Sequence, residues 1–216
     1  WDMLDYGKRL ASLIFGLFLY GLGLVCVIQA NIGLAPWEAF GIGVAGVTGL
    51  TYGKVYILSG VVIVFIVLLM KEKIGFGTIL NTLLIGTFSD LILYLELIPQ
   101  MDRLIPGILL LLVGEEVVSL GSYFYMKPGL GAGPRDSLMV ALGKRLPRVP
   151  IGVIRCGIEG TVLLVGYLLG AKVGIGTVIA VLAIGFLLQQ TCRILGLDLK
   201  GIHHESIFAT ISTLKE

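Results

Sequence analysis

The segment Lys127-Pro-Gly-Leu-Gly-Ala-Gly-Pro-Arg-Asp-Ser-Leu-Met139 follows a long apolar run and interrupts regular structure with glycine and proline. A more degenerate version of it, Ala30-Asn-Ile-Gly-Leu-Ala-Pro-Trp-Glu-Ala-Phe40, also follows a long apolar run. In both segments a proline stands where a helix would restart, and a carboxylate falls in the first turn of that helix. Broken segments at matching places in two halves of a chain are typical of transporter binding sites. The two segments therefore predict a duplicated chain.

The composition indicates a polytopic membrane protein. Of the 216 residues, 56% are hydrophobic and 14% are charged, and the mean hydropathy is +0.99. A water-soluble domain carries about a quarter of its residues as charges. The sequence shows no basic patch with interleaved aromatic residues, so we do not expect a nucleic-acid partner. It also shows no nucleophile–base pairing, metal-ligand cluster or cofactor fingerprint, so we expect neither an enzyme nor a bound metal or cofactor.

Six apolar runs have about the length needed to cross a hydrocarbon core of about 30 Å. They are residues 10–30, 55–70, 76–97, 104–126, 151–169 and 173–192. The stretch 32–53 and the stretch after Pro134 are too interrupted by glycine, proline or charge to cross, and we expect each to form a re-entrant or half-helix element. The expected fold is thus a single all-α membrane domain over residues 1–216 with six transmembrane helices. Residues 197–216, with His203 and His204, form its expected cytoplasmic tail.

An alignment of the two halves supports the duplication. At an offset of 98 residues, Gly16, Gly23, Gly33 and Pro36 coincide with Gly114, Gly121, Gly131 and Pro134. At an offset of 99, Lys73-Ile-Gly-Phe-Gly-Thr78 coincides with Lys172-Val-Gly-Ile-Gly-Thr177. We expect the glycines of these two runs to form tight turns. The match predicts two three-helix repeats, over residues 10–98 and 104–196. Because each repeat has an odd number of spans, the second is expected to be inverted relative to the first.

The basic residues favour a cytoplasmic N-terminus. With that orientation, the following positions are cytoplasmic: Lys8, Arg9, Lys71, Lys73, Lys127, Arg135, Lys144, Arg145, Arg148, Arg193, Lys200 and Lys215. Only Lys54, Arg103 and Lys172 then lie outside, with Arg155 inside a span. An excess of lysine and arginine in cytoplasmic loops is the general rule for membrane proteins. An eight-span alternative, in which the broken segments cross, places Lys71 and Lys73 outside and is disfavoured.

These motifs resemble a known family. The Gly-Leu-Ala-Pro-Trp-Glu run at 33–38, the Gly-Ala-Gly-Pro-Arg-Asp run at 131–136 and the two glycine-threonine runs resemble the YczE/YyaS/YitT group of bacterial membrane proteins. The similarity covers nearly the whole chain. It implies a protein of the bacterial inner membrane, and it implies no catalytic residues.

Glu115 and Glu116 fall at the middle of the span 104–126. An ionised carboxylate at mid-bilayer costs at least about 2.5–3.5 kcal/mol, so such a residue is a functional candidate. Glu115, Ser119 and Ser122 share one helical face and predict a polar stripe toward the bundle interior. Both glutamates, together with Asp90, are candidates for proton coupling. Two alternatives are that one glutamate pairs structurally with Arg155, and that Asp90 lies near water at the end of its span.

Arg155 and Glu159 are four residues apart on one face of their helix and are expected to pair. Arg155 alone cannot neutralise Glu115, Glu116, Glu159 and Asp90. The membrane interior therefore has a surplus of acidic groups. Protonation or a bound cation would resolve that surplus, which suits a proton-coupled carrier or a carrier of a cationic substrate.

The proline motifs contribute a second set of candidates. Glu38 and Asp136 are equivalent, and they either cap a helix N-terminus or contact a substrate. Trp37 and Arg135 are also equivalent. If the motifs meet near the midplane, Arg135 and the helix N-terminal amides could hold an anionic group, and otherwise Arg135 lies at the cytoplasmic interface. The structural positions of the motifs are Gly33, Pro36, Gly131, Gly133 and Pro134.

The sequence therefore predicts a small secondary transporter of a polar or charged molecule, with a site between the repeats. The expected substrate-binding residues are Trp37, Glu38, Glu115, Glu116, Arg135, Asp136, Arg155 and Glu159. The alternative hypothesis is a non-transporting membrane scaffold or assembly factor, whose polar residues hold helices together. The expected partners of the protein are the lipid bilayer and an unidentified small-molecule substrate, and a homodimer is possible on the sequence alone.

Overall fold

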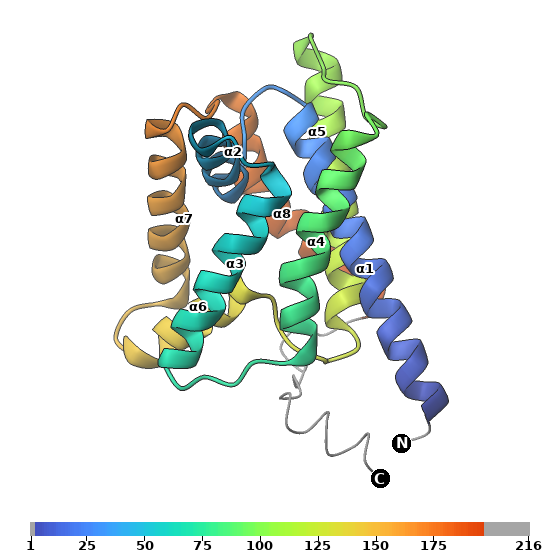
Figure 1. Ribbon diagram of the computed structural model, residues 1–216, viewed down its shortest axis with the longest axis vertical. Coiled ribbons are helices and arrows are strands. Elements are labelled where there is room, and N and C mark those ends of the chain that lie inside the picture. Colours follow the sequence, from blue (N-terminus) through green and yellow to red (C-terminus); the bar gives the residue numbers. More distant parts are fainter. Residues whose placement is uncertain (1–2, 197–216) are drawn as a thin grey trace.

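The computed structural model describes residues 3–196, and these residues form eight helices (Figure 1). The helices are α1 (Met3–Gln29), α2 (Pro36–Thr48), α3 (Tyr52–Leu69), α4 (Phe76–Tyr94), α5 (Leu104–Met126), α6 (Pro134–Arg145), α7 (Ile151–Leu168) and α8 (Ile175–Ile194). The expected tail at 197–216, with His203 and His204, lies outside the described residues. The all-α fold is confirmed.

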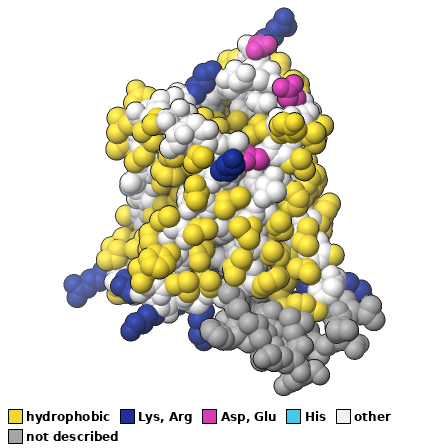
Figure 2. All heavy atoms as spheres, viewed as in Figure 1, with side chains coloured by type: hydrophobic (Ala, Val, Ile, Leu, Met, Phe, Trp, Pro, Cys, Tyr) yellow, Lys and Arg dark blue, Asp and Glu magenta, His cyan; other side chains and the backbone are white. Residues whose placement is uncertain are grey.

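Five of these helices, α1, α3, α4, α5 and α8, are long and apolar enough to cross a membrane. Each corresponds to one of the six predicted spans. The remaining predicted span, 151–169, forms α7, which has 18 residues and is not among the five. Figure 2 shows hydrophobic side chains over the middle of one face, with lysine and arginine gathered most visibly toward its lower end.

The helices α1 and α5 pack closely along glycines. A Cβ atom placed on Gly16 would lie 2.7 Å from the carbonyl oxygen of Gly121. One placed on Gly23 would lie 2.6 Å from the carbonyl oxygen of Gly114. Small residues allow such close backbone approach in membranes. Since position 16 faces 121 while position 23 faces 114, α1 and α5 run in opposite directions.

The two short helices restart where the sequence predicts. Pro36 and Pro134 are the first residues of α2 and α6, and the preceding residues have extended backbone. Proline is well suited to this position because a first-turn amide would lack a helical partner. Figure 1 shows α2 in the upper half of the molecule and α6 in the lower half. The chain therefore leaves helical structure before Pro36 and before Pro134, and two short helices follow these breaks.

Each broken segment is held by the turn that precedes a helix of the other half. The amide of Gly176, in the first turn of α8, donates to the carbonyl of Ile32 at 2.9 Å. The amide of Gly77, in the first turn of α4, donates to the carbonyl of Leu130 at 2.8 Å. The carbonyl groups of Ile32 and Leu130 lie outside helices and have no helical hydrogen-bond partner, so these contacts supply one. Buried backbone groups in a membrane require such partners.

Glycine is needed on both sides of these contacts. Gly33 and Gly131 have φ angles of 128° and 137°, which side chains rarely adopt. A Cβ atom on Gly33 would lie 2.7 Å from the amide nitrogen of Gly174, and one on Gly131 would lie 2.8 Å from Gly75 Cα. The prediction that the two runs Lys73–Thr78 and Lys172–Thr177 form tight turns is wrong: each run is extended up to its first glycine and then begins α4 or α8. Each run also supports a broken segment.

The α1–α5 contact can be tested by adding a single methyl group. Gly121→Ala places a Cβ atom 2.6 Å from the backbone nitrogen of Tyr20, so the two helices must separate. We expect a loss of about 1–3 kcal/mol in the free energy of unfolding in detergent micelles.

The matched control is Gly46→Ala, where the added Cβ atom meets nothing within 4 Å. This control should be neutral or slightly stabilising because alanine favours helix over glycine. Equal unfolding free energies for the two variants would contradict the packing described here.

Candidate functional site

The two proline motifs meet inside the bundle through Arg135. The guanidinium carbon of Arg135 lies 4.4 Å from the ring centre of Trp37 and 4.8 Å from that of Tyr56. Arg135 Nη1 also lies 3.7 Å from Glu38 Oε1. The side chains of Arg135 and Glu38 are only 22% and 6% exposed. Arg135 therefore points into the protein and contacts the other motif, and its interpretation as a cytoplasmic interface residue is wrong.

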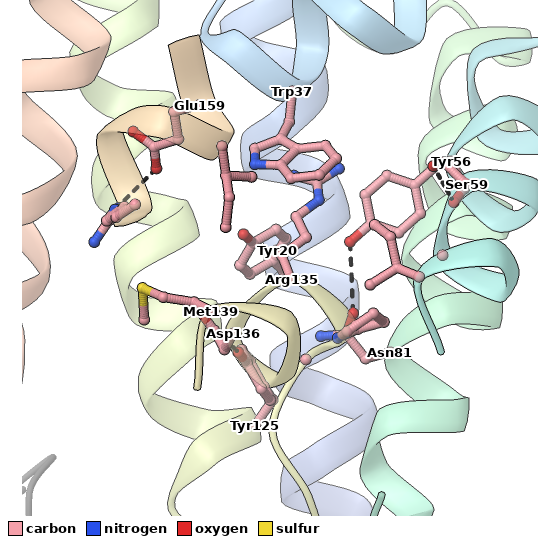
Figure 3. Close-up of a pocket in the computed structure, with 16 residues that line it drawn as sticks. Tyr20, Trp37, Tyr56, Ser59, Asn81, Tyr125, Arg135, Asp136, Met139 and Glu159 are labelled. Atoms are coloured by element: carbon pink, nitrogen blue, oxygen red, sulfur yellow. Dashed lines mark hydrogen bonds and ion pairs between the residues drawn. The ribbon is translucent and has the colours of Figure 1, made fainter. Parts of the chain in front are cut away.

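Two cavities adjoin this contact, and Arg135 and Trp37 line both of them. Cavity 1 has a volume of about 120 Å³ and is drawn in Figure 3. Its polar and aromatic lining comprises Tyr20, Trp37, Tyr56, Ser59, Asn81, Tyr125, Arg135, Asp136, Arg155 and Glu159. The hydroxyl of Tyr125 donates to Asp136 at 3.2 Å, and that of Tyr56 donates to Asn81 at 3.5 Å. Cavity 1 therefore offers hydrogen-bonding groups on several sides.

Cavity 2 has a volume of about 100 Å³. It shares Tyr20, Trp37, Arg135, Arg155 and Glu159 with cavity 1 and adds Glu38 and Glu115. The rest of its lining is apolar: Leu24, Val27, Ala35, Pro36, Val118, Ala180, Val181 and Ile184. This lining combines charged groups with hydrocarbon walls.

The linings differ at equivalent positions of the two halves. Tyr125 lines cavity 1, and Val27, which is 98 residues earlier, lines cavity 2. Asn81 lines cavity 1, and Ala180, which is 99 residues later, lines cavity 2. At these two pairs of aligned positions, cavity 1 has hydrogen-bonding side chains and cavity 2 has small aliphatic side chains.

Glu115 lies on the predicted polar stripe. Glu115, Ser119 and Ser122 are 3%, 0% and 4% exposed, so this face of α5 is turned inward. The Ser119 hydroxyl donates to the backbone carbonyl of Glu115. Within residues 3–196 the Glu115 carboxyl has neither a hydrogen bond nor an ion pair with another side chain, although it lines cavity 2. An unpaired buried carboxyl group is costly unless it is protonated or meets a cation.

The predicted pair on α7 is present. Arg155 Nε donates to Glu159 Oε1 at 2.8 Å, and both residues line both cavities. In Figure 3, Glu159 lies on α7 in the upper part of the view, and a dashed line marks its bond to Arg155. Because Arg155 is engaged by Glu159, the alternative in which it neutralises Glu115 or Glu116 is not observed.

Two of the predicted site residues lie away from the cavities. Glu116 accepts a hydrogen bond from the Thr191 hydroxyl of α8 at 2.9 Å. Asp90 accepts from the Gly53 amide at 2.7 Å and from the Thr51 hydroxyl, and so caps the N-terminus of α3. The structure therefore gathers Trp37, Glu38, Glu115, Arg135, Asp136, Arg155 and Glu159 but not Glu116 or Asp90.

Sequence reasoning missed five polar or aromatic lining residues of cavity 1: Tyr20, Tyr56, Ser59, Asn81 and Tyr125. One signal was available for Tyr20. Tyrosine in membrane proteins gathers at the two interfaces, so a tyrosine in the middle of the apolar run 10–30 indicates a polar interior, whereas Tyr56 and Tyr125 stand near the ends of their runs. Asn81 is likewise an amide within a span, and it is 3% exposed.

The fold and the cavities define a multi-pass membrane protein with a charged interior site. The chain belongs to a family of unknown function, DUF6198, whose model matches residues 7–193. An uncharacterized protein of Haemophilus influenzae is 31% identical over 182 residues, which are 84% of this chain and 82% of that protein. The uncharacterized membrane protein YczE of Bacillus subtilis is 31% identical over 176 residues, which are 81% of this chain and 80% of YczE.

The uncharacterized protein YyaS of Bacillus subtilis is 25% identical over 177 residues, which are 81% of this chain and 87% of YyaS. The resemblance to the YczE and YyaS proteins is therefore confirmed. No solved structure matches the chain.

The Arg135–Glu38 contact can be tested by removing one partner and then both. Arg135→Gln leaves the buried Glu38 carboxyl without its cation, so we expect the free energy of unfolding in micelles to fall by about 1–3 kcal/mol. Adding Glu38→Gln should restore part of this loss.

The control is Lys144→Gln, which removes a 2.7 Å ion pair between Lys144 and Glu72 at the surface. Exposed pairs contribute at most about 1 kcal/mol, so its effect should be small. If Arg135→Gln lowers the free energy of unfolding no more than Lys144→Gln does, the interior pair is not holding the motifs together.

Proposed function

We propose that this protein is a small secondary transporter of a polar or charged molecule. The observation that carries the proposal is the pair of cavities at the contact between two broken helices. Transporters bind their substrates near the membrane midplane, at the interface of structural repeats that contain broken helices. Charged residues inside a membrane protein mark substrate or ion pathways. The gathering of charged side chains around Arg135 fits both rules.

The proposal includes two inverted repeats, with α7 as the sixth span. Equivalent helices α1 and α5 run in opposite directions, and their glycine contacts are reciprocal. The hydrogen bonds from Gly176 to Ile32 and from Gly77 to Leu130 join equivalent positions in exchanged roles. Such reciprocity is expected when two copies of a unit are related by a two-fold axis in the membrane plane.

The proposed location is the bacterial inner membrane, with both termini cytoplasmic. The start of α1 and the loops after α3 and α6 lie at the lower end in Figure 1. These segments contain Lys8, Arg9, Lys71, Lys73, Arg145 and Arg148. The positive-inside rule favours the lower end as the cytoplasmic one.

An unequal pair of helix contacts supports alternating access. The second residue of α3 is Gly53, and a Cβ atom there would lie 2.1 Å from the carbonyl oxygen of Gly86 on α4. The equivalent glycines, 99 residues later, are Gly152 on α7 and Gly185 on α8. A Cβ atom on either of these meets nothing within 4 Å. The α3–α4 contact is therefore closed, and its counterpart between α7 and α8 is open.

The exposure of the two motif carboxylates agrees with this asymmetry. Asp136 at the start of α6 is exposed, whereas the equivalent Glu38 at the start of α2 is 5% exposed. We propose that the structure represents a state open toward the lower end. In the opposite state α7 and α8 would close through Gly152 and Gly185 while α3 and α4 separate. Rocking of one repeat against the other is the usual form of alternating access.

Proton coupling is part of the proposal, and Glu115 is its best candidate. Of the three carboxylates considered for this role, Glu115 lines a cavity, while Glu116 and Asp90 are hydrogen-bonded elsewhere. A proton and a cationic substrate would compete for the unpaired Glu115 carboxyl, which couples their movements in exchange.

The proposed second state can be trapped by a disulfide. In a variant without Cys26, Cys156 and Cys192, the substitutions Gly152→Cys and Gly185→Cys should form an intramolecular disulfide under mild oxidation in native membranes, detectable by peptide mass spectrometry. Disulfide formation needs Cα atoms within about 7 Å, so it requires α7 and α8 to close.

A matched pair of alanine variants sets the direction of the effect. Gly53→Ala places a Cβ atom against Gly86 and should raise the yield of the 152–185 disulfide. Gly86→Ala, which places its Cβ atom 2.6 Å from the carbonyl oxygen of Gly53, should do the same. Absence of the disulfide in every background would count against alternating access and favour a scaffold.

A further inference from the structure

Cavity 2 has an unbalanced negative charge. Five charged side chains line it: Glu38, Glu115, Arg135, Arg155 and Glu159. Arg135 is paired with Glu38, and Arg155 is paired with Glu159. Glu115 is left over, 3% exposed and without a partner among residues 3–196. When Glu115 is ionised, the cavity therefore lacks one positive charge.

An anion or an uncharged polar molecule would not meet this need. Both arginines already have carboxylate partners, so no free cationic group is left to receive an anion. A neutral molecule would leave Glu115 without a cation, so the carboxyl would have to take up a proton to stay buried.

A bare metal ion also fits poorly. Hard cations such as Ca²⁺ are held by six to eight oxygen atoms, and Mg²⁺ by six. Glu38 and Glu159 are engaged by arginines, and the remaining walls are largely aliphatic. Among residues 3–196 no group of three or more histidine, cysteine or acidic side chains is placed to hold a metal.

We infer that cavity 2 binds a small organic cation, an alkylated ammonium group, against Glu115. Its alkyl groups would contact Leu24, Val27, Val118 and Ala180, which line the same cavity. The rings of Tyr20 and Trp37 offer the aromatic surface that favours quaternary ammonium groups. This inference deepens the proposed transport function and rests on it.

The volume limits the size of this cation. A cavity of about 150 Å³ in another protein holds benzene, which has six heavy atoms. By the same ratio, a volume of about 100 Å³ suits a group of about four heavy atoms. The trimethylammonium head of choline is of this size, and the rest of choline would extend into cavity 1, which shares five lining residues with cavity 2.

The test uses choline and 3,3-dimethylbutan-1-ol, which have the same shape but differ in charge. Each is titrated calorimetrically into the purified full-length protein in lipid nanodiscs. We expect saturable binding of choline and at least tenfold weaker binding of the alcohol, since an ion pair at a buried site contributes about tenfold to hundredfold in affinity.

Adjacent glutamates provide the matched variants. Glu115→Gln should weaken choline binding by about tenfold or more. Glu116→Gln should leave it unchanged because Glu116 is bonded to Thr191 outside the cavity. Binding to the wild type should also weaken as the pH is lowered, because protons compete for Glu115. The other titratable or charged groups that line the cavity are Tyr20, Glu38, Arg135, Arg155 and Glu159.

Three outcomes would overturn the inference: equal binding of the alcohol, unchanged binding in Glu115→Gln, or no binding of choline and tetramethylammonium. Each is separable from failure of the carrier function, because closing of α7 on α8 is measured by the 152–185 disulfide without any ligand. If that disulfide forms but no cation binds, only the substrate class is wrong.

Discussion

The structure depends on how two unwound stretches of backbone satisfy their polar groups inside a membrane. The chain leaves helical structure between α1 and α2 and again between α5 and α6. Lipid cannot form hydrogen bonds with these backbone amides and carbonyls, so other parts of the protein must do so. The segments that precede α4 and α8 provide these bonds. The amides of Gly176 and Gly77 donate to the carbonyls of Ile32 and Leu130. The amide of Leu34 in turn donates to the carbonyl of Lys172 at 2.9 Å. The Thr78 hydroxyl adds a 2.6 Å bond to the carbonyl of Ala132.

These crossed supports place the two proline motifs at the centre of the protein. Since each motif is held by the opposite half, α2 packs against α7 and α6 packs against α3. Arg135 can then reach Trp37 and Glu38 across the interface. On the proposed mechanism, the moving bodies therefore mix elements from both repeats, while the close α1–α5 contact serves as the fixed frame.

Local features of the site could be predicted from the sequence because they depend on short-range geometry. The helix restarts at Pro36 and Pro134 follow from proline chemistry, and the Arg155–Glu159 pair follows from four-residue spacing. The inward stripe of Glu115, Ser119 and Ser122 follows from helical periodicity.

The meeting of distant segments could not be predicted in the same way. Nothing in the local sequence of Arg135 shows that it contacts Trp37 and Tyr56 rather than the cytoplasmic interface. The choice depends on the crossed packing of α6 against α3. Glu116 differs from Glu115 by one position, and only the neighbouring Thr191 of α8 shows that it is bonded outside the cavities.

The most direct test of the account is the distance between the first turn of α7 and the middle of α8, which the proposed closing would shorten. Spin labels at Val153 and Phe186, which are both exposed, can report this distance by pulsed electron paramagnetic resonance in lipid nanodiscs. We predict two distance populations, with the shorter one corresponding to closed helices, and a change in their ratio between acidic and alkaline pH. A single distance that stays constant over the same pH range would contradict the account.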